Sequence, residues 1–411
     1  MKTIKLKPAV VVYLSGLVII HIAVFWNLRR LVEKGYSDFT IYYCAARIVR
    51  QGLGHELYDD QTQFRVQQEF SKEVSIRQGP LPFNHPPFEA LLFLPFTSFS
   101  YLAAFALWDL VNLAMLVVLP FLLRPYLPML QSHAWPLWML AMLAFFPIFL
   151  ALLQGQDAIL LLFLYTLAYV CLKKKYDAWA GCWLALGLFK FHLVVPLVVL
   201  LVAQGRKKVC YGFGAVAAVL TVVSFAVAGR KAMISYPNYV LRVEGTTAGG
   251  AISPAGMPNL RGFLWSVLPS NVDFRPLVFM LSVGIVFYAA WHCRGKENLN
   301  LFDFKFSLAA VVTVFVSYHA MAYDLSILML PTFLVANELL RKESVSEWPG
   351  WLMSCAGAGL FFSPLPLLLL MRYGHLAMMG LAVLLCLFGI ARLISAQTPE
   401  NVGSPKVEIA G

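Results

Sequence analysis

The stretch that decides the fold is residues 29–87, which opens RRLVEKGYSDFTIYYCAARIVRQGLGHELYDDQTQF and closes PLPFNHPP. It lies between two long apolar runs, and the carboxylate of Asp38 comes soon after the first of them. An ionisable group at the edge of a bilayer is costly and usually has a function. We therefore expect this segment to carry the functional site, and the apolar remainder to form its membrane scaffold.

Composition predicts an all-α polytopic membrane protein. Of the 411 residues, 60% are hydrophobic and 13% are charged, whereas soluble proteins have about 25% charged residues. The net charge of +11 comes from short Lys and Arg clusters between apolar runs, as the positive-inside bias produces. Nucleic acid is therefore not an expected partner. Most of the seven cysteines lie inside apolar runs without metal-ligand spacing, so free, buried and inert thiols are expected.

The basic clusters also predict the orientation. Lys2, Lys5 and Lys7 precede the first apolar run, residues 8–28, so the N-terminus should be cytoplasmic and the segment 29–87 should lie outside. Within that outer segment, helical spacing of apolar residues predicts surface helices over residues 38–50 and 60–73.

Two further basic clusters, residues 173–175 and 206–208, mark the cytoplasmic side again. The roughly 29 residues between them are too few for two full crossings, which need about 40. We therefore expect a pair of short helices that meet at a break near residues 189–192. Such a break is allowed only where it lines a protein cavity.

The other apolar runs complete a single membrane domain over residues 1–394. They give about 12 spans, or 13 if the run 88–123, interrupted near residues 97–100, crosses twice. Two cytoplasmic termini favour 12. A second outer segment, residues 229–276, is rich in Gly, Pro, Ser and Thr and is expected to be loop-like. The short polar tail, residues 395–411, is expected to be disordered. The remaining spans are predicted at residues 135–153, 158–172, 209–228, 277–292, 304–319, 323–340, 351–370 and 376–393.

This topology brings many polar side chains to the outer face, where we expect the site. A proton or ion pathway would instead distribute ionisable groups across the membrane depth. The candidate residues are Asp38, Tyr42, Tyr43, Asp59, His85, Asp157, Lys190, His192, Asn259, Arg261, His319 and Asp324.

Several motifs together resemble glycosyltransferase family 87. They cover most of residues 30–340 and occur in the expected order and topology. The sequence departs from the family pattern at Asp157, His85 and the Lys190-Phe191 pair, where the family often has Asn, Tyr and Lys-Pro. The matching motifs are Asp38-Phe39 with Tyr42-Tyr43, Leu57-Tyr58-Asp59, His85-Pro86-Pro87-Phe88, Leu107-Trp108 with Asn112, Gly155-Gln156-Asp157, Ala180-Gly181 with Gly187 and Phe189-Lys190, Asn259-Leu260-Arg261-Gly262, and His319 with Tyr323-Asp324.

The resemblance implies a GT-C fold and a polyprenol-phosphate-mannose-dependent mannosyltransferase. Asp38 would then be the general base of an inverting transfer, with His319 as a second catalytic residue. The donor phosphate would be bound by Lys190, Arg261 and His192. A monophosphate leaving group needs cationic or hydrogen-bonding partners rather than a metal. The expected substrate-binding residues are Tyr42, Tyr43, Asp59, His85, Asp157, Asn259 and Asp324.

The implied partners are a polyprenyl-phosphate-linked sugar, a lipid or glycan acceptor, and membrane lipids. The implied location is the inner (plasma) membrane of a bacterium, with the site facing the periplasm or cell exterior. Asp38, Asp59 and Asp157 could instead cap the helices that follow them. The chain as a whole could be a transporter or lipid flippase, a non-catalytic envelope scaffold, or an enzyme of the same class that transfers another sugar.

Overall fold

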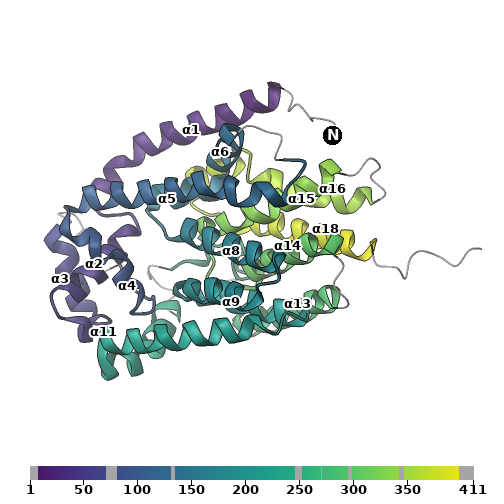
Figure 1. The fold of residues 1–411 in the computed structure, drawn as a ribbon. Helices are drawn as coiled ribbons and strands as arrows, with labels where there is room; N and C mark the ends of the chain where they lie inside the picture. Colours follow the sequence, from purple (N-terminus) through teal and green to yellow (C-terminus); the bar gives the residue numbers. More distant parts are fainter. Residues whose placement is uncertain are drawn as a thin grey trace, which may run out of the picture.

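The structure is a computed structural model that describes residues 8–70, 81–130, 135–245, 252–269, 271–294, 299–341 and 347–397. These parts of the chain contain helices and no strand. Figure 1 shows most of the long helices side by side in one bundle. The main helices of the bundle are α1 (Pro8–Glu33), α5 (Tyr101–Leu123), α8 (Ala158–Lys173), α9 (Asp177–Leu186), α10 (Phe191–Ala203), α11 (Val209–Gly245), α13 (Arg275–Cys293), α14 (Leu299–Val316), α15 (Met329–Arg341) and α18 (Gly380–Ser395).

The chain is an integral membrane protein. Within the described ranges, seven helices are long and apolar enough to cross a membrane, or up to nine if each bent pair is counted as one span. The predicted spans at 135–153 and 351–370 are these bent pairs rather than straight helices. The first is α6 (Trp135–Ala144) with α7 (Phe146–Gln154), bent by 75°, and the second is α16 (Trp348–Leu360) with α17 (Leu365–Tyr373), bent by 49°. The predicted count of 12 is therefore not confirmed.

The outer segment forms a helical layer at one end of the bundle. Its helices are α2 (Phe39–Arg50), α3 (Asp60–Phe70) and the short α4 (Glu89–Phe93), which lie together in Figure 1. Helices were predicted at the first two positions, and they begin there as expected; residues 71–73 of the second prediction lie outside the described residues. The predicted interruption near residues 97–100 is also present, because a 3₁₀ turn ends at Ser98 and α5 starts at Tyr101.

The predicted pair of short helices is α9 and α10, joined by a 3₁₀ turn at Gly187–Lys190. Arg206, just beyond α10, contacts Asp177 at the start of α9, with 2.9 Å between Nη1 and Oδ1. The stretch Asp177–Ala203, one of the seven candidate spans, therefore folds back on itself. A Cβ on Gly187 would lie 2.8 Å from the Leu161 side chain, so this glycine allows the tip to pack closely on α8.

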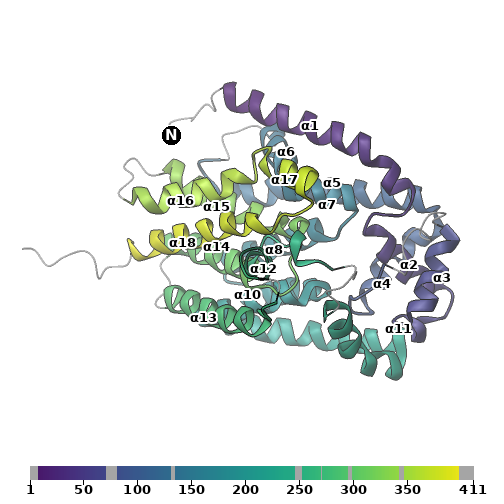
Figure 2. The same ribbon diagram turned by 180° about the vertical axis from the view of Figure 1, so that it is seen from behind.

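Part of the second outer segment is helical, which corrects the prediction of a loop there. α11 continues through it to Gly245, with a non-helical Gly229 (φ 71°, ψ 170°) as the joint. Beyond the joint, Ala232, Tyr239 and Val243 are buried against the outer helical layer. The short α12 (Leu260–Val267) lies near the centre of Figure 2. Packing on the outer layer outweighs a composition that is typical of loops, because burial of an apolar face stabilises a helix more than propensity does.

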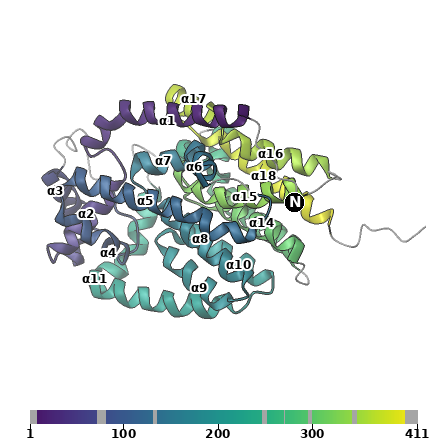
Figure 3. The same ribbon diagram turned by 45° about the horizontal axis from the view of Figure 1, so that its top comes forward.

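The core of the bundle is built around α14, whose side chains from Leu301 to Val316 are buried. It packs against α10, α13, α15 and α18, and Tyr169 of α8 hydrogen-bonds its Asp303. In Figure 3, α1 and α17 lie on one side of this core and α9 and α11 on the other. α14 ends at Val316, so the predicted span 304–319 stops just before His319. α18 ends at Ser395, and the predicted tail lies outside the described residues from 398 onward.

Candidate active site

Two adjoining cavities lie between the outer helical layer and the bundle. The larger has a volume of about 230 Å³ and the smaller about 80 Å³. Both are lined by Asn84, His85, His319 and Tyr323. The larger cavity is also lined by Phe189, Lys190, Phe191, His192, Val240, Leu241, Glu244 and Tyr318, and the smaller by Asp38, Ile41, Leu81, Pro82, Gln156, Ile252 and Met321.

Asp38 lines the smaller cavity and is held through both its backbone and its side chain. It directly precedes α2, but its side chain makes no capping hydrogen bond to that helix. The Asp38 backbone N–H instead donates to Gln154 Oε1 at 3.0 Å, and Gln156 Nε2 donates to Asp38 Oδ2 at 2.8 Å. The Tyr323 hydroxyl also hydrogen-bonds this carboxylate. The capping alternative therefore does not describe the Asp38 side chain.

Lys190 is buried at the tip of the α9–α10 pair among three acceptors. Its Nζ lies 2.8 Å from Asp157 Oδ1, 2.6 Å from Asp324 Oδ1 and 3.1 Å from Gln156 Oε1. An ammonium group has three N–H donors, and these three contacts account for all of them. The sequence predicted that Lys190 binds a donor phosphate; in this structure its ammonium contacts two carboxylates.

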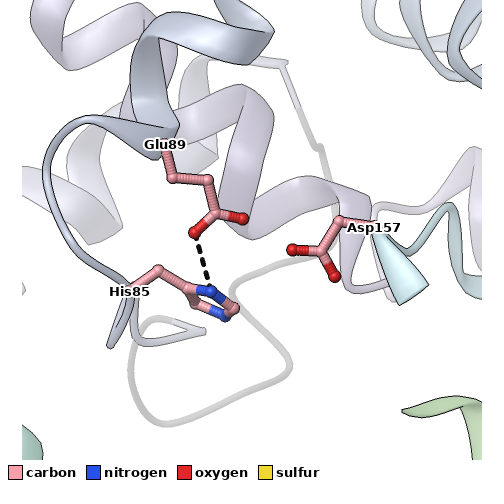
Figure 4. Close-up of side chains that lie close together, drawn as sticks. All are labelled: His85, Glu89 and Asp157. Atoms are coloured by element: carbon pink, nitrogen blue, oxygen red, sulfur yellow. Dashed lines mark ion pairs between the residues drawn. The ribbon is translucent and has the colours of Figure 1, made fainter. Parts of the chain in front are cut away.

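His85, Glu89 and Asp157 converge in Figure 4, and Asp157 also contacts Lys190. His85 Nδ1 is 2.8 Å from Glu89 Oε2, and the Glu89 and Asp157 carboxyl groups hydrogen-bond each other. Burial, with Asp157 nearby, raises the pKa of Glu89 well above its usual value, which favours the protonated form of this carboxyl group. Burial alone would raise the pKa of Asp157, but the Lys190 ammonium holds it below its usual value. Burial lowers the pKa of His85 to about 4.

The same three residues could hold a metal ion. One ligand atom from each lies within 4.8 Å of the others, and an imidazole with two carboxylates is a donor set that Zn²⁺ accepts. However, Asp157 Oδ1 is already bound by Lys190. A buried ammonium and a proton on Glu89 can together balance these carboxylates, as a cation would.

A second buried cluster surrounds Glu244 on the far wall of the larger cavity. Glu244 binds Arg261 Nη1 through Oε2 at 2.8 Å and His319 Nδ1 through Oε1 at 2.6 Å. Beside it, His192 Nδ1 is 2.8 Å from Ser317 Oγ. Both imidazole rings line the cavity and are held through Nδ1, so Nε2 is the nitrogen that each can offer to a ligand.

Three predicted site residues serve the fold instead of lining either cavity. Tyr43 donates its hydroxyl to the Phe99 carbonyl at 2.7 Å and lies outside both cavities. Asp59 accepts from the Thr62 backbone N–H and so caps α3. Asn259 caps α12 through Gly262 and donates to the Ser317 carbonyl.

The remaining predicted residues lie together at the site. Tyr42 donates to Gln156 Oε1 at 2.7 Å, so it belongs to the buried network rather than to an interfacial belt of aromatic residues. Asp324 and Asp157 flank Lys190, as described above. Arg261 is buried with its guanidinium on Glu244 and on the Tyr318 carbonyl.

Sequence reasoning missed several polar residues of the site, and Glu89, Gln156 and Glu244 show why. Glu89 follows His85 by one helical turn, and a carboxylate in the apolar stretch HPPFEALLF is a signal that could have found it. Gln156 was seen only as part of a motif. Glu244 lay in a segment expected to be a loop, so no signal set it apart from a solvated surface charge.

Comparison with known proteins assigns the class. The sequence model of glycosyltransferase family 87 matches residues 83–317, which is more than half of the chain. Comparison with curated proteins and with solved structures gives no match. The matched range contains His85, Lys190, His192 and Glu244, which line the cavities. It also contains Asp157 and Arg261, which bind Lys190 and Glu244. The chain is therefore a membrane protein that belongs to glycosyltransferase family 87.

Proposed function

We propose that this glycosyltransferase moves a hexose, mannose, from a polyprenyl-phosphate carrier to a lipid-linked or glycan acceptor. Membership of the family favours an enzyme over the transporter and scaffold alternatives. The observation that carries the proposal is the position of Asp38. Its carboxylate lines a small cavity that adjoins a larger one containing two imidazoles. One carboxylate beside phosphate-binding groups is what a single-displacement transfer from a lipid phosphate needs.

In the proposed step, the acceptor hydroxyl lies in the smaller cavity against Asp38. The acceptor oxygen forms a bond to the anomeric carbon as the Asp38 carboxylate takes the hydroxyl proton. The bond from the anomeric carbon to the phosphate oxygen breaks, and its electron pair leaves with the polyprenyl phosphate. Attack opposite the leaving group inverts the configuration, so no second carboxylate nucleophile is required.

The leaving phosphate is proposed to lie in the larger cavity against His192 and His319. In its protonated form, His319 can donate from Nε2 to a phosphate oxygen while Nδ1–H donates to Glu244, which stabilises the developing charge. Arg261 acts through Glu244, because its Nη1 is bound to that carboxylate. We propose that the step uses no metal. Phe191, Val240 and Leu241 give this cavity an apolar side, which suits a lipid carrier.

The site is proposed to face the outer side of a bacterial inner membrane, with both termini in the cytoplasm. The support comes from the two ends of α8: Asp157 precedes it at the site, and residues 173–175 end it. A helix of this length spans about 24 Å, and Arg206 brings the next basic cluster to the same far end. Basic clusters favour the cytoplasmic side.

The test is transfer of label from radiolabelled polyprenyl-phosphate-mannose into a membrane lipid extract, by purified protein in lipid nanodiscs with EDTA present. Wild type should transfer label, and Asp38→Asn should be slower by about 10²–10⁴-fold, the usual contribution of a general base. Wild-type transfer should also fall at acid pH as the base is protonated. Equal rates for the two proteins would remove Asp38 from the mechanism, and loss of transfer in EDTA would contradict the metal-free step. Binding of glucose- or arabinose-linked carriers, but not the mannose-linked one, would replace mannose in the proposal.

A further inference from the structure

In the tight turn after α7, neighbouring side chains contact two different residues, Asp38 and Lys190. Gly155 has a left-handed backbone (φ 60°), and a Cβ there would lie 2.8 Å from the Phe39 Cβ and the Phe105 ring. Gln154 and Gln156, on either side of this glycine, both bind Asp38, whereas Asp157 binds Lys190. The turn is therefore fixed by packing and connects the two groups.

A second dipeptide repeats this arrangement from the other side of the site. Tyr323 hydrogen-bonds the Asp38 carboxylate, and the next residue, Asp324, binds Lys190 at 2.6 Å. In both Gln156-Asp157 and Tyr323-Asp324, the first residue holds Asp38 and the second holds Lys190. A single buried ammonium thus draws together the two chain segments that hold Asp38.

The orientation of the Gln156 amide follows from its partners. Its Oε1 lies 3.1 Å from Lys190 Nζ and 2.7 Å from the Tyr42 hydroxyl, and both of these groups donate. Nε2 must therefore be the atom that faces Asp38 Oδ2, to which it donates at 2.8 Å. If Lys190 were withdrawn, the amide oxygen would lose one of the two donors that fix the rotation of the group.

We propose that Lys190 is a positioning residue that fixes the Asp38 carboxylate through Gln156-Asp157 and Tyr323-Asp324, and that it does not bind the donor phosphate. This inference rests on the proposed function, since it takes Asp38 to be the base. The three N–H groups of the ammonium are already directed at carboxylate and amide oxygens. A lysine used in this way contributes to turnover by holding geometry, because a misplacement of about 1 Å can cost about 10²-fold in rate.

The test separates binding of the donor from turnover. Lys190→Met is compared with wild type in nanodiscs, with equilibrium binding and transfer of polyprenyl-phosphate-mannose measured on the same preparation. We expect turnover to fall about 100-fold, while the dissociation constant of the donor changes by less than about threefold. A donor affinity that falls tenfold or more would instead make Lys190 a phosphate ligand and overturn the inference. Lys173→Met, which removes the ammonium from a partly buried pair at the far end of α8, is the matched control and should leave both quantities unchanged.

A second variant keeps the inference testable if Lys190→Met does not fold. Gln156→Glu preserves the shape and the acceptor facing Lys190 and Tyr42, but it places a carboxylate oxygen against Asp38. Like charges disfavour ionisation, so the acid limb of the pH–rate profile should move to higher pH. The other titratable side chains that line the small cavity are His85, His319 and Tyr323, and this variant leaves them in place. An unshifted profile would show that Gln156 does not hold the base.

Failure of the positioning role of Lys190 can be distinguished from failure of the proposed function. If Asp38→Asn transfers as fast as wild type, Asp38 is not the base, and the proposed mechanism and this inference fail together. If Asp38→Asn is inactive while Lys190→Met turns over normally, the mechanism stands and only the positioning role fails.

Discussion

Two sets of ion pairs lie at opposite ends of α8, one partly buried and one fully buried, and they differ in charge balance. At the far end, Lys173 pairs with Asp303 and Arg206 with Asp177, one cation for each carboxylate. At the site end, Lys190 alone contacts two carboxylates, and Glu89 hydrogen-bonds one of them. Only the site-end set adjoins the two cavities described above. An ion pair that is shielded from water therefore does not by itself mark an active site, because structural pairs are shielded as well.

The difference between the two ends of α8 is tested most strongly by removing one carboxylate from each end. Asp324→Asn should lower turnover about 100-fold, since it loosens one of the two segments that hold Asp38. Asp303→Asn should lower the free energy of unfolding by about 1.5–3 kcal/mol, the usual contribution of a charged hydrogen bond, and leave turnover of the folded protein unchanged. Transfer assays and thermal unfolding in the same detergent measure both. A large loss of turnover in Asp303→Asn would mean that the two ends are coupled.

The second cluster of the site should respond differently from the Lys190 network. His319→Ala removes an imidazole from the phosphate side of the cavity, so the donor dissociation constant should rise about tenfold, which is about 1.4 kcal/mol. Donor-binding measurements check this. His292→Ala is the control, because His292 lies near the end of α13, outside both cavities, and its Nδ1 contacts the Tyr288 carbonyl of its own helix. Unchanged donor binding by His319→Ala would remove His319 from the phosphate site.

The proton on Glu89 can be tested through stability. Glutamine resembles a protonated glutamate, so Glu89→Gln should fold and retain most activity. The pKa of Glu89 is raised in the folded protein. At a pH above about 4.5, its ordinary pKa, unfolding of the wild type therefore releases this proton. The contribution of Glu89 to the free energy of unfolding consequently falls as pH rises. The variant lacks that loss. Its melting temperature relative to wild type should therefore increase from pH 5 to pH 8. A constant difference would mean that Glu89 is ionised, and a chelator-sensitive wild type would indicate a metal at this position.

The smallest expected effects come from adjacent tyrosines. Tyr42→Phe removes one of the two donors to Gln156 Oε1 and should lower turnover about threefold to tenfold, because a hydrogen bond contributes about 0.5–1.5 kcal/mol. Tyr43→Phe removes a bond to the Phe99 carbonyl and should cost about the same in stability, with no change in turnover. Equal turnover of the two variants would place Tyr42 outside the network.

The sequence alone determined the membrane class, the outer helices and the break at the tip of α9 and α10. Apolar runs, helical periodicity and the spacing of basic clusters are local patterns, and they constrain a chain in a bilayer strongly. They also brought Asp38, Lys190, Asp157 and Asp324 to one face. They could not tell which partner each would choose.

Tertiary structure alone decided those partners. The α11 extension formed because Ala232, Tyr239 and Val243 could pack on the outer layer, and it carried Glu244 to Arg261 and His319. Likewise, Lys190 lies between Asp157 and Asp324, although Asp324 is 134 positions away in the sequence. Such contacts depend on how helices pack in three dimensions, which is not encoded in any single stretch of the chain.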